Sequence, residues 1–168
     1  PGGSARATDR ILVVDCGAQY AQLIARRVRE TDVFSEIVPH DLTAAEFAER
    51  APTGIIFSGG PASVHVEGAP RIDPGVYDLG VPILGICYGA QLIAQQLGGT
   101  VGRGDGGEYG RTTMHRTEGV ESELLPTELP DAQTVWMSHF DAVTETPEGF
   151  VATAATPGAP MAVIECHD

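Results

Sequence analysis

The sequence predicts an α/β protein built on an open, mostly parallel sheet with helices on both faces. Up to Gly99, short continuous apolar runs of the kind found in buried parallel strands recur along the chain. Amphipathic helical patterns separate these runs, and strands that alternate with helices at this spacing are typical of a parallel sheet. After Gly99 the strand signals continue without intervening helices, which predicts an antiparallel or mixed extension at one edge of the sheet.

Each expected element of the first part rests on a local signal. A run that pairs Thr43 with Glu46 fits a capping box and starts one helix. The expected strands are Ile11 to Asp15, Ser35 to Val38, Gly54 to Phe57 and Val81 to Ile86. The expected helices are Tyr20 to Glu30, a segment from near Thr43, Pro74 to Leu79, and a segment that leaves the turn at 85–89 and ends at Gly98.

The second part is expected to open with a loop and continue as strands. Gly102 to Gly110 is rich in glycine and is expected to form a loop. Its glycines match the dinucleotide-binding pattern G-x-G-x-x-G, but no helix follows, so we interpret the match as chance. The expected strands are Val135 to Ser138, Phe150 to Ala155 and Met161 to Cys166.

Composition limits the possible functions. The 168 residues fit one domain with a real core, and 42% hydrophobic content with a mean hydropathy near zero is typical of a soluble protein. A net charge of −13 argues against nucleic acid or an anionic membrane as a partner. Three widely spaced cysteines indicate no disulfide framework, and we expect a cytoplasmic protein. Residues 1–9 are small and polar, and we expect a flexible tail there.

The strongest chemical signal is Gly85-Ile86-Cys87-Tyr88-Gly89, between an apolar strand and a helical pattern. Strand, Gly-x-nucleophile-x-Gly and helix is the arrangement of a nucleophile elbow, which places the central side chain above the sheet. A thiol at a helix N-terminus is expected to favour the reactive thiolate. The alternative is a buried, inert cysteine at a strand end, and the two flanking glycines favour the nucleophile.

Other candidate groups lie at the same edge of the predicted sheet. The loop Ser58-Gly59-Gly60-Pro61 could present backbone N–H groups beside the thiol, and the N–H of Tyr88 could be a second oxyanion donor. An ordinary glycine turn is the alternative for that loop. None of the five histidines is marked as a base, although His139 follows a strand and could lie near the site. No Cys/His spacing fits a metal, so no metal site is predicted.

These motifs resemble a known family. GICYG with Gln91, the SGGP loop, and the opening Val14 to Tyr20 followed by QLIARRVRE are similar to class I (triad) glutamine amidotransferases. The nearest resemblance is to the glutaminase domain of GMP synthetase, and Glu108-Tyr109-Gly110 and Trp136 to His139 also fit that subgroup. The resemblance covers residues 10–168.

The resemblance implies a flavodoxin-like fold and hydrolysis of L-glutamine through a cysteine thioester. By matching position, Cys87 is the nucleophile, and the N–H groups of Gly60 and Tyr88 form the oxyanion hole. The residues expected to hold the amino-acid end of glutamine are Gln91, Ser138, His139, Phe140 and Asp141. The implied partner is an ATP-pyrophosphatase (synthetase) domain or subunit that uses the ammonia, with ATP and Mg²⁺, to aminate XMP to GMP. No cofactor is expected in the glutaminase domain itself.

The sequence departs from the family in two places. The family's base and its orienting acid lie in an H-P-E motif that does not occur here, so we expect an amidotransferase domain over 10–168 without its last strand and helix, capable of thiol chemistry but not of efficient turnover. Phe140 stands where the family usually has glycine, which is expected to narrow the glutamine pocket. Two alternatives remain. One is a non-catalytic glutaminase-like module that binds glutamine or regulates a partner synthetase, and the second is a γ-glutamyl-hydrolase-like enzyme. The opening from Asp15 to Glu30 speaks against the second.

Overall fold

The computed structural model describes residues 9–17 and 19–167. The expected N-terminal tail, residues 1–9, lies outside this range except for Asp9. The described chain divides between Ile93 and Ala94 into two compact units, and each is treated separately below. The single amidotransferase domain expected over 10–168 stays a prediction.

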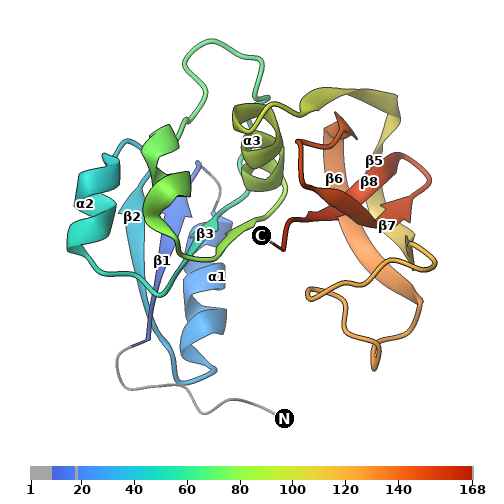
Figure 1. Ribbon diagram of the computed structural model, residues 1–168. Coiled ribbons are helices and arrows are strands. Elements are labelled where there is room, and N and C mark those ends of the chain that lie inside the picture. The colour runs from blue at the N-terminus through green and yellow to red at the C-terminus, as the bar shows by residue number, and fades with distance from the viewer. Residues whose placement is uncertain (1–8, 18, 168) are drawn as a thin grey trace. The chain divides into compact units, whose positions relative to one another are not determined.

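The first unit is built on a four-stranded parallel sheet in the order β2-β1-β3-β4 (Figure 1). This is the start of the flavodoxin-like strand order, and it confirms the predicted parallel α/β fold. The elements, in chain order, are β1 (Arg10–Asp15), α1 (Tyr20–Arg29), β2 (Phe34–Pro39), α2 (Ala44–Glu49), β3 (Gly54–Phe57), the 3₁₀ helix η1 (Pro74–Leu79), β4 (Ile83–Gly85) and α3 (Tyr88–Gln96).

Apolar side chains cover both faces of this sheet. On one face, Val13 is fully buried against Ala21 and Ala25 of α1. Neighbouring residues of a strand point to opposite faces, so Leu12 and Val14 lie on the other side, where they are also fully buried. On that second side the ring of Phe57 in β3 meets Tyr77 of η1 edge to face, with centroids 6.2 Å apart. Helices therefore pack on both faces, as the sequence predicts.

The helices α2 and η1 are held by hydrogen bonds at their N-terminal caps. The Thr43 hydroxyl accepts the Glu46 N–H, and the Glu46 carboxylate accepts the Thr43 N–H, which confirms the predicted capping box. Asp73 caps η1 by accepting the Gly75 N–H at 3.0 Å, and its other oxygen accepts the Ala44 N–H at 2.7 Å. One carboxylate thus joins α2 to η1, and these backbone N–H groups hold its pKa below the usual value.

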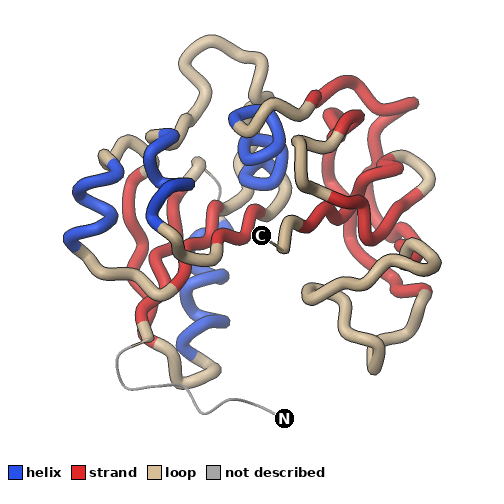
Figure 2. The backbone as a smooth tube through the Cα atoms, viewed as in Figure 1, coloured by secondary structure: helices blue, strands red, loops and turns tan. Residues whose placement is uncertain are grey.

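The second unit is an antiparallel sheet in the order β6-β5-β7-β8. Its strands are β5 (Thr100–Arg116), β6 (Ala132–Glu145), β7 (Val151–Thr156) and β8 (Ala159–Glu165). Figure 2 shows these strands joined by loops, and beyond the end of α3 every regular element described here is a strand. The predicted antiparallel part is confirmed. Among the described residues, however, it forms a sheet of its own rather than an extension hydrogen-bonded to the parallel sheet.

The prediction of a loop over Gly102 to Gly110 is wrong. This segment belongs to β5, which pairs with β6 except where the register shifts between Arg103 and Glu108. Gly106 and Gly107 have φ values of 140° and 66°, which glycine adopts at little cost and which let the strand bulge and resume pairing. The same glycines that resemble a loop in the sequence therefore support an irregular strand.

A buried carboxylate, Glu165, fastens the long loop after β5 to the end of β8. Its Oε1 accepts hydrogen bonds from the hydroxyls of Ser122 and Thr153, and its Oε2 accepts the Glu123 N–H at 2.8 Å. Glu165 is only 6% exposed. Burial raises its pKa, but these hydrogen bonds to the charged form outweigh burial and hold the pKa below the usual 4.5.

No helix among the described residues is long and apolar enough to span a membrane.

We expect the second unit to lose stability in acid through Glu165. Its folded pKa lies below that of the unfolded chain, so the unfolded state binds the proton first as the pH falls through 4.5. Stability from Glu165 is therefore complete above that pH and is lost below it. Urea unfolding from pH 7 to pH 3.5 measures this, and Glu165→Gln should be less stable at pH 7 and show a shallower pH dependence. An unchanged pH dependence in the variant would contradict this role.

Candidate active site

The strand β4 and the helix α3 join at a sharp turn with Cys87 at its centre. Cys87 has a φ of 54°, a left-handed conformation that is rare for residues other than glycine, and it is exposed. A Cβ on Gly85 would lie 2.6 Å from the backbone of Gly89 and Ala90, and a Cβ on Gly89 would lie 2.4 Å from the carbonyl oxygen of Phe57. Both glycines are therefore required by close packing, as a nucleophile elbow needs.

The loop after β3 lies against this turn. The N–H of Ile86 donates to the carbonyl of Phe57 at 3.0 Å, which carries the β3–β4 contact into the elbow. A Cβ built on Gly59 would lie 3.5 Å from the Cβ of Cys87, so the loop runs beside the thiol-bearing residue with room for a methyl group between them. Gly60 has no such room, because its Cβ would lie 2.3 Å from the carbonyl oxygen of Cys16. The expected neighbourhood of Gly60, Cys87 and Tyr88 is present in the first unit.

A buried serine holds the loop in place. Ser58 is fully buried, and its Oγ accepts the N–H of Cys16 at 2.9 Å and donates to the carbonyl of Gly59 at 3.0 Å. These bonds tie the end of β1 to the loop after β3, next to the elbow. Sequence reasoning treated Ser58 only as part of a glycine-rich loop. A small hydroxyl residue directly after a buried strand was the available signal.

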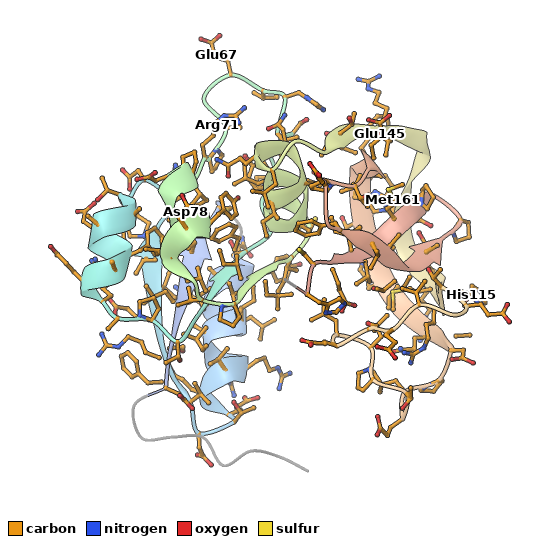
Figure 3. The ribbon with its side chains drawn as sticks, viewed as in Figure 1. Glu67, Arg71, Asp78, His115, Glu145 and Met161 are labelled. Carbon is orange, nitrogen blue, oxygen red and sulfur yellow. The ribbon has the colours of Figure 1, made fainter. Side chains whose placement is uncertain are left out.

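Tyr88 links the elbow to the long loop that precedes η1. Its side chain is buried, and its hydroxyl donates to the carbonyl of Pro70. Arg71, next in the chain, donates to the carbonyl of Val64 at 3.2 Å, so this loop closes on itself. Figure 3 shows Arg71 on this loop and Glu67 at its tip, pointing away from the sheet. The side chain of Tyr88 therefore anchors the surrounding loop, and its backbone N–H interacts with the thiol of Cys87.

The environment of Cys87 raises the pKa of its thiol. Packed atoms around the sulfur remove water, although the residue is partly exposed, and this effect outweighs the Tyr88 backbone N–H that lowers the pKa. The Tyr88 N–H at the helix N-terminus favours the thiolate, as expected, but desolvation has the larger effect. Cys16 is fully buried, and burial raises its pKa to about 11, so it is the less reactive of the two thiols.

The remaining predicted residues fall into two groups. Gln91 lies one turn along α3 from Cys87, and its backbone N–H donates to the Cys87 carbonyl at 3.1 Å. The others, Ser138, His139, Phe140 and Asp141, are consecutive residues of β6 in the second unit. The structure therefore brings Cys87, Tyr88, Gly60 and Gln91 together in one unit and the four β6 residues together in the other.

Within β6 the four residues differ in environment. His139 is nearly buried, with Nε2 2.9 Å from Glu108 Oε2 and Nδ1 3.0 Å from the carbonyl of Asp141. Phe140 is 45% exposed, and the guanidinium carbon of Arg103 lies 5.0 Å from its ring centroid. Glu108 was not predicted as a functional residue, and its place in the motif Glu108-Tyr109-Gly110 was the only signal in the sequence. Among the residues described, no cluster of three or more His, Cys, Asp or Glu side chains could hold a metal ion.

Comparison with known proteins gives a consistent result. The sequence model of the family Glutamine amidotransferase class-I matches residues 12–168. The glutamine-hydrolysing GMP synthase of Nocardia farcinica is 57% identical over 155 residues, and that of Thermobifida fusca is 56% identical over 160. These matches cover 92% and 95% of this chain but only 29% and 30% of the relatives. The chain thus spans less than a third of the length of these curated relatives.

Solved structures show the same relationship. A protein from Thermoplasma acidophilum, described as one of the subunits of a GMP synthase, is 31% identical with a TM-score of 0.79, and the match covers 96% of this chain and 80% of that one. A glutamine amidotransferase from Thermotoga maritima is 17% identical with a TM-score of 0.65, covering 95% and 74% of the two chains. At that identity the second match shows a shared fold alone.

Gly59 and Gly60 are adjacent in the loop after β3, but their packing predicts that alanine is tolerated at the first and destabilising at the second. Gly60→Ala should lower the free energy of unfolding by about 1–3 kcal/mol, because its Cβ would overlap the Cys16 carbonyl. Gly59→Ala is the matched control, since its Cβ meets only ordinary contacts at 3.5 Å and beyond. Urea unfolding of both variants measures the difference. Equal losses of stability would contradict the described packing.

The raised pKa of Cys87 predicts the pH dependence of its alkylation. Iodoacetamide reacts with the thiolate, so its rate at Cys87 should rise about tenfold per pH unit and still be rising at pH 9, the usual thiol value. Peptide mass spectrometry of Cys87, with Cys16 as an internal buried control, follows the rate. A rate that levels off below pH 8 would show a thiolate already formed and would contradict the described environment.

Proposed function

The chain belongs to the class I glutamine amidotransferase family, and we propose that it is the glutaminase unit of a GMP synthase that hydrolyses L-glutamine to supply ammonia. The observation that carries this proposal is Cys87, held at a positive φ between two glycines that have no room for a side chain. A cysteine needs no such conformation for packing alone, because an exposed thiol contributes little to a core. The geometry is that of a nucleophile presented above a sheet.

In the proposed reaction the sulfur of Cys87 attacks the side-chain amide carbon of glutamine. The C–S bond forms, the C–N bond breaks, and ammonia leaves with the added proton, which yields a γ-glutamyl thioester. Water then attacks the thioester carbon, and the products are glutamate and the free Cys87 thiol. Both steps pass through a tetrahedral oxyanion, which hydrogen-bond donors already in place stabilise.

The oxyanion donors in this proposal are the backbone N–H groups of Gly60 and Tyr88. Three fixed contacts support the proposal. Gly60 is locked beside the carbonyl of Cys16, Ser58 pins the start of its loop, and the buried Tyr88 side chain fixes its own backbone. Donors that do not need to reorganise are worth about 3–4 kcal/mol each in acyl-transfer enzymes.

Because the pKa of Cys87 is raised, the reaction also requires a base. A thiol that is protonated at neutral pH needs a base to accept its proton, and the same group can return that proton to the leaving ammonia. In this family that base is expected from the H-P-E motif. The thiol therefore reacts slowly on its own and fast when the base is in place.

The remaining roles follow from the resemblance. We propose that Gln91 and the residues Ser138 to Asp141 contact the amino-acid end of glutamine, and that the protein acts in the cytoplasm. The partner is an ATP-pyrophosphatase domain or subunit that uses ATP and Mg²⁺ to aminate XMP to GMP. The names of the Nocardia farcinica and Thermoplasma acidophilum proteins support this assignment.

The proposal is tested by exposing the chain to acivicin, an electrophilic glutamine analogue. We expect a single covalent adduct at Cys87, observed by intact-mass and peptide mass spectrometry, and suppressed by excess glutamine. Asparagine, which is one methylene shorter, is the matched competitor and should suppress labelling at least about tenfold less well. Cys87→Ala should take up no reagent.

Two outcomes would count against the proposal. Equal labelling of Cys16, Cys87 and Cys166 would show no selective thiol. Labelling of Cys87 that glutamine does not suppress would show a reactive cysteine without a glutamine site. A third outcome, suppression by glutamine without any ammonia release once a segment with the H-P-E motif and the synthetase partner are both supplied, would favour a non-catalytic glutamine-binding module.

A further inference from the structure

We infer that Glu108 is a positioning residue for the β6 segment 138–141, holding it through His139 in the conformation that receives glutamine. The inference rests on the proposed function, because it takes from that proposal the role of 138–141 in binding the substrate. The inference goes beyond the proposed function because it names Glu108, a residue outside segment 138–141, as one on which glutamine binding depends.

The first link is the hydrogen bonding of the His139 ring. Nε2 lies 2.9 Å from Oε2 of Glu108, and Nδ1 lies 3.0 Å from the carbonyl oxygen of Asp141. A carboxylate and a carbonyl oxygen are acceptors only, so a proton on either ring nitrogen is donated to the oxygen that this nitrogen faces. The side chains of His139 and Glu108 are each only 9% exposed, so water competes little for these bonds.

The second link is the effect of that ring on the backbone of β6. Between the paired positions Arg103–Asp141 and Glu108–His139, β5 has four residues where β6 has only Phe140, which makes three extra residues in β5. Regular ladder pairing is interrupted at this point, and the bond from His139 Nδ1 to the Asp141 carbonyl spans the interruption. The shape of segment 138–141 therefore depends on the orientation of one imidazole ring.

The third link is the anchoring of Glu108 itself. Its Oε2 also accepts the Thr156 hydroxyl at 2.6 Å, and its Oε1 accepts the Gly158 N–H at 2.9 Å, both from the turn between β7 and β8. A Cβ on Gly158 would lie 2.5 Å from Glu108 Cγ, so the turn closes tightly over the carboxylate. Glu108 is thus fixed from one side and holds His139 on the other.

The electrostatics agree with this geometry. Burial raises the pKa of Glu108, but the hydrogen bonds from Thr156, Gly158 and His139 outweigh burial and hold the pKa below 4.5. The carboxylate is therefore ionised at neutral pH. It can accept from three donors at once, as the described contacts require.

The test measures glutamine binding in the whole 168-residue chain, with Cys87→Ser in every variant to prevent turnover. Isothermal titration calorimetry should show that Glu108→Gln raises the dissociation constant for glutamine about tenfold, the loss typical of a buried charge-assisted hydrogen bond. Glu165→Gln is the matched control, because Glu165 is an equally well hydrogen-bonded buried carboxylate of the same unit whose hydrogen bonds come from Ser122, Glu123 and Thr153. It should lower stability but change the dissociation constant less than twofold.

A second variant covers the case in which Glu108→Gln fails to fold. Thr156→Val removes one donor to Oε2 and leaves both Glu108 and His139 in place, so a weakening of about threefold is expected. NMR gives a readout independent of glutamine. The hydrogen-bonded ring N–H of His139 should exchange slowly with water in the parent chain and should exchange fast in Glu108→Gln.

The outcomes separate the two proposals. Binding by the parent chain that weakens equally in Glu108→Gln and Glu165→Gln, or in neither, would overturn the positioning role of Glu108. His139 ring protons that remain protected in Glu108→Gln would overturn it as well. A parent chain that binds no glutamine would overturn the proposed function, and with it the substrate-binding role given to 138–141.

Discussion

The close approach of α3 to the backbone of β3 is the constraint on which the first unit depends. The Cβ position of Gly89 lies 2.4 Å from the carbonyl oxygen of Phe57, so only a glycine lets the helix start this close to the sheet. The chain turns at Cys87 with a positive φ, and Gly59 of the loop after β3 lies beside this turn. Strand order then determines what surrounds the turn. Parallel strands deliver the loops after β1, β3 and β4 to one edge, where Ser58 and Cys16 connect them.

The second unit depends instead on two buried carboxylates. Glu108 and Glu165 are both ionised carboxylates surrounded by donors from several strands and loops. Burial of a charge is costly unless every oxygen is hydrogen-bonded, and both residues meet this condition. Each therefore fixes the segments that donate to it, one at the end of β8 and the other at the irregular pairing of β5 and β6. At both places the position of the chain therefore depends on a carboxylate that stays ionised.

The sequence predicted the parallel sheet well because each buried strand and each cap has a local signature. Gly54 to Phe57 is a continuous apolar run, and Thr43 with Glu46 forms the capping box that the spacing indicates. The elbow was equally visible, since its two glycines serve local packing. The errors lie where partners distant in the sequence decide the outcome. The glycines from 102 to 110 became a strand because β6 pairs with them, and Glu108 gained its role from Thr156 and Gly158, some fifty residues away. The favourable N–H at Cys87 was visible in the sequence, but the larger effect of desolvation was not, because it depends on packing that no local pattern encodes.

The protonated resting state of Cys87 has a consequence for how such a protein survives in the cell. Peroxide and other oxidants attack thiolates far faster than thiols, and the first product, a sulfenic acid, leads on to irreversible acids. An exposed cysteine with a lowered pKa would be open to this damage whenever the protein is idle. Desolvation keeps the sulfur protonated and so slow to oxidise, even though it stands at the surface. A nucleophile that reacts fast only while a base acts on it is chemically durable between turnovers.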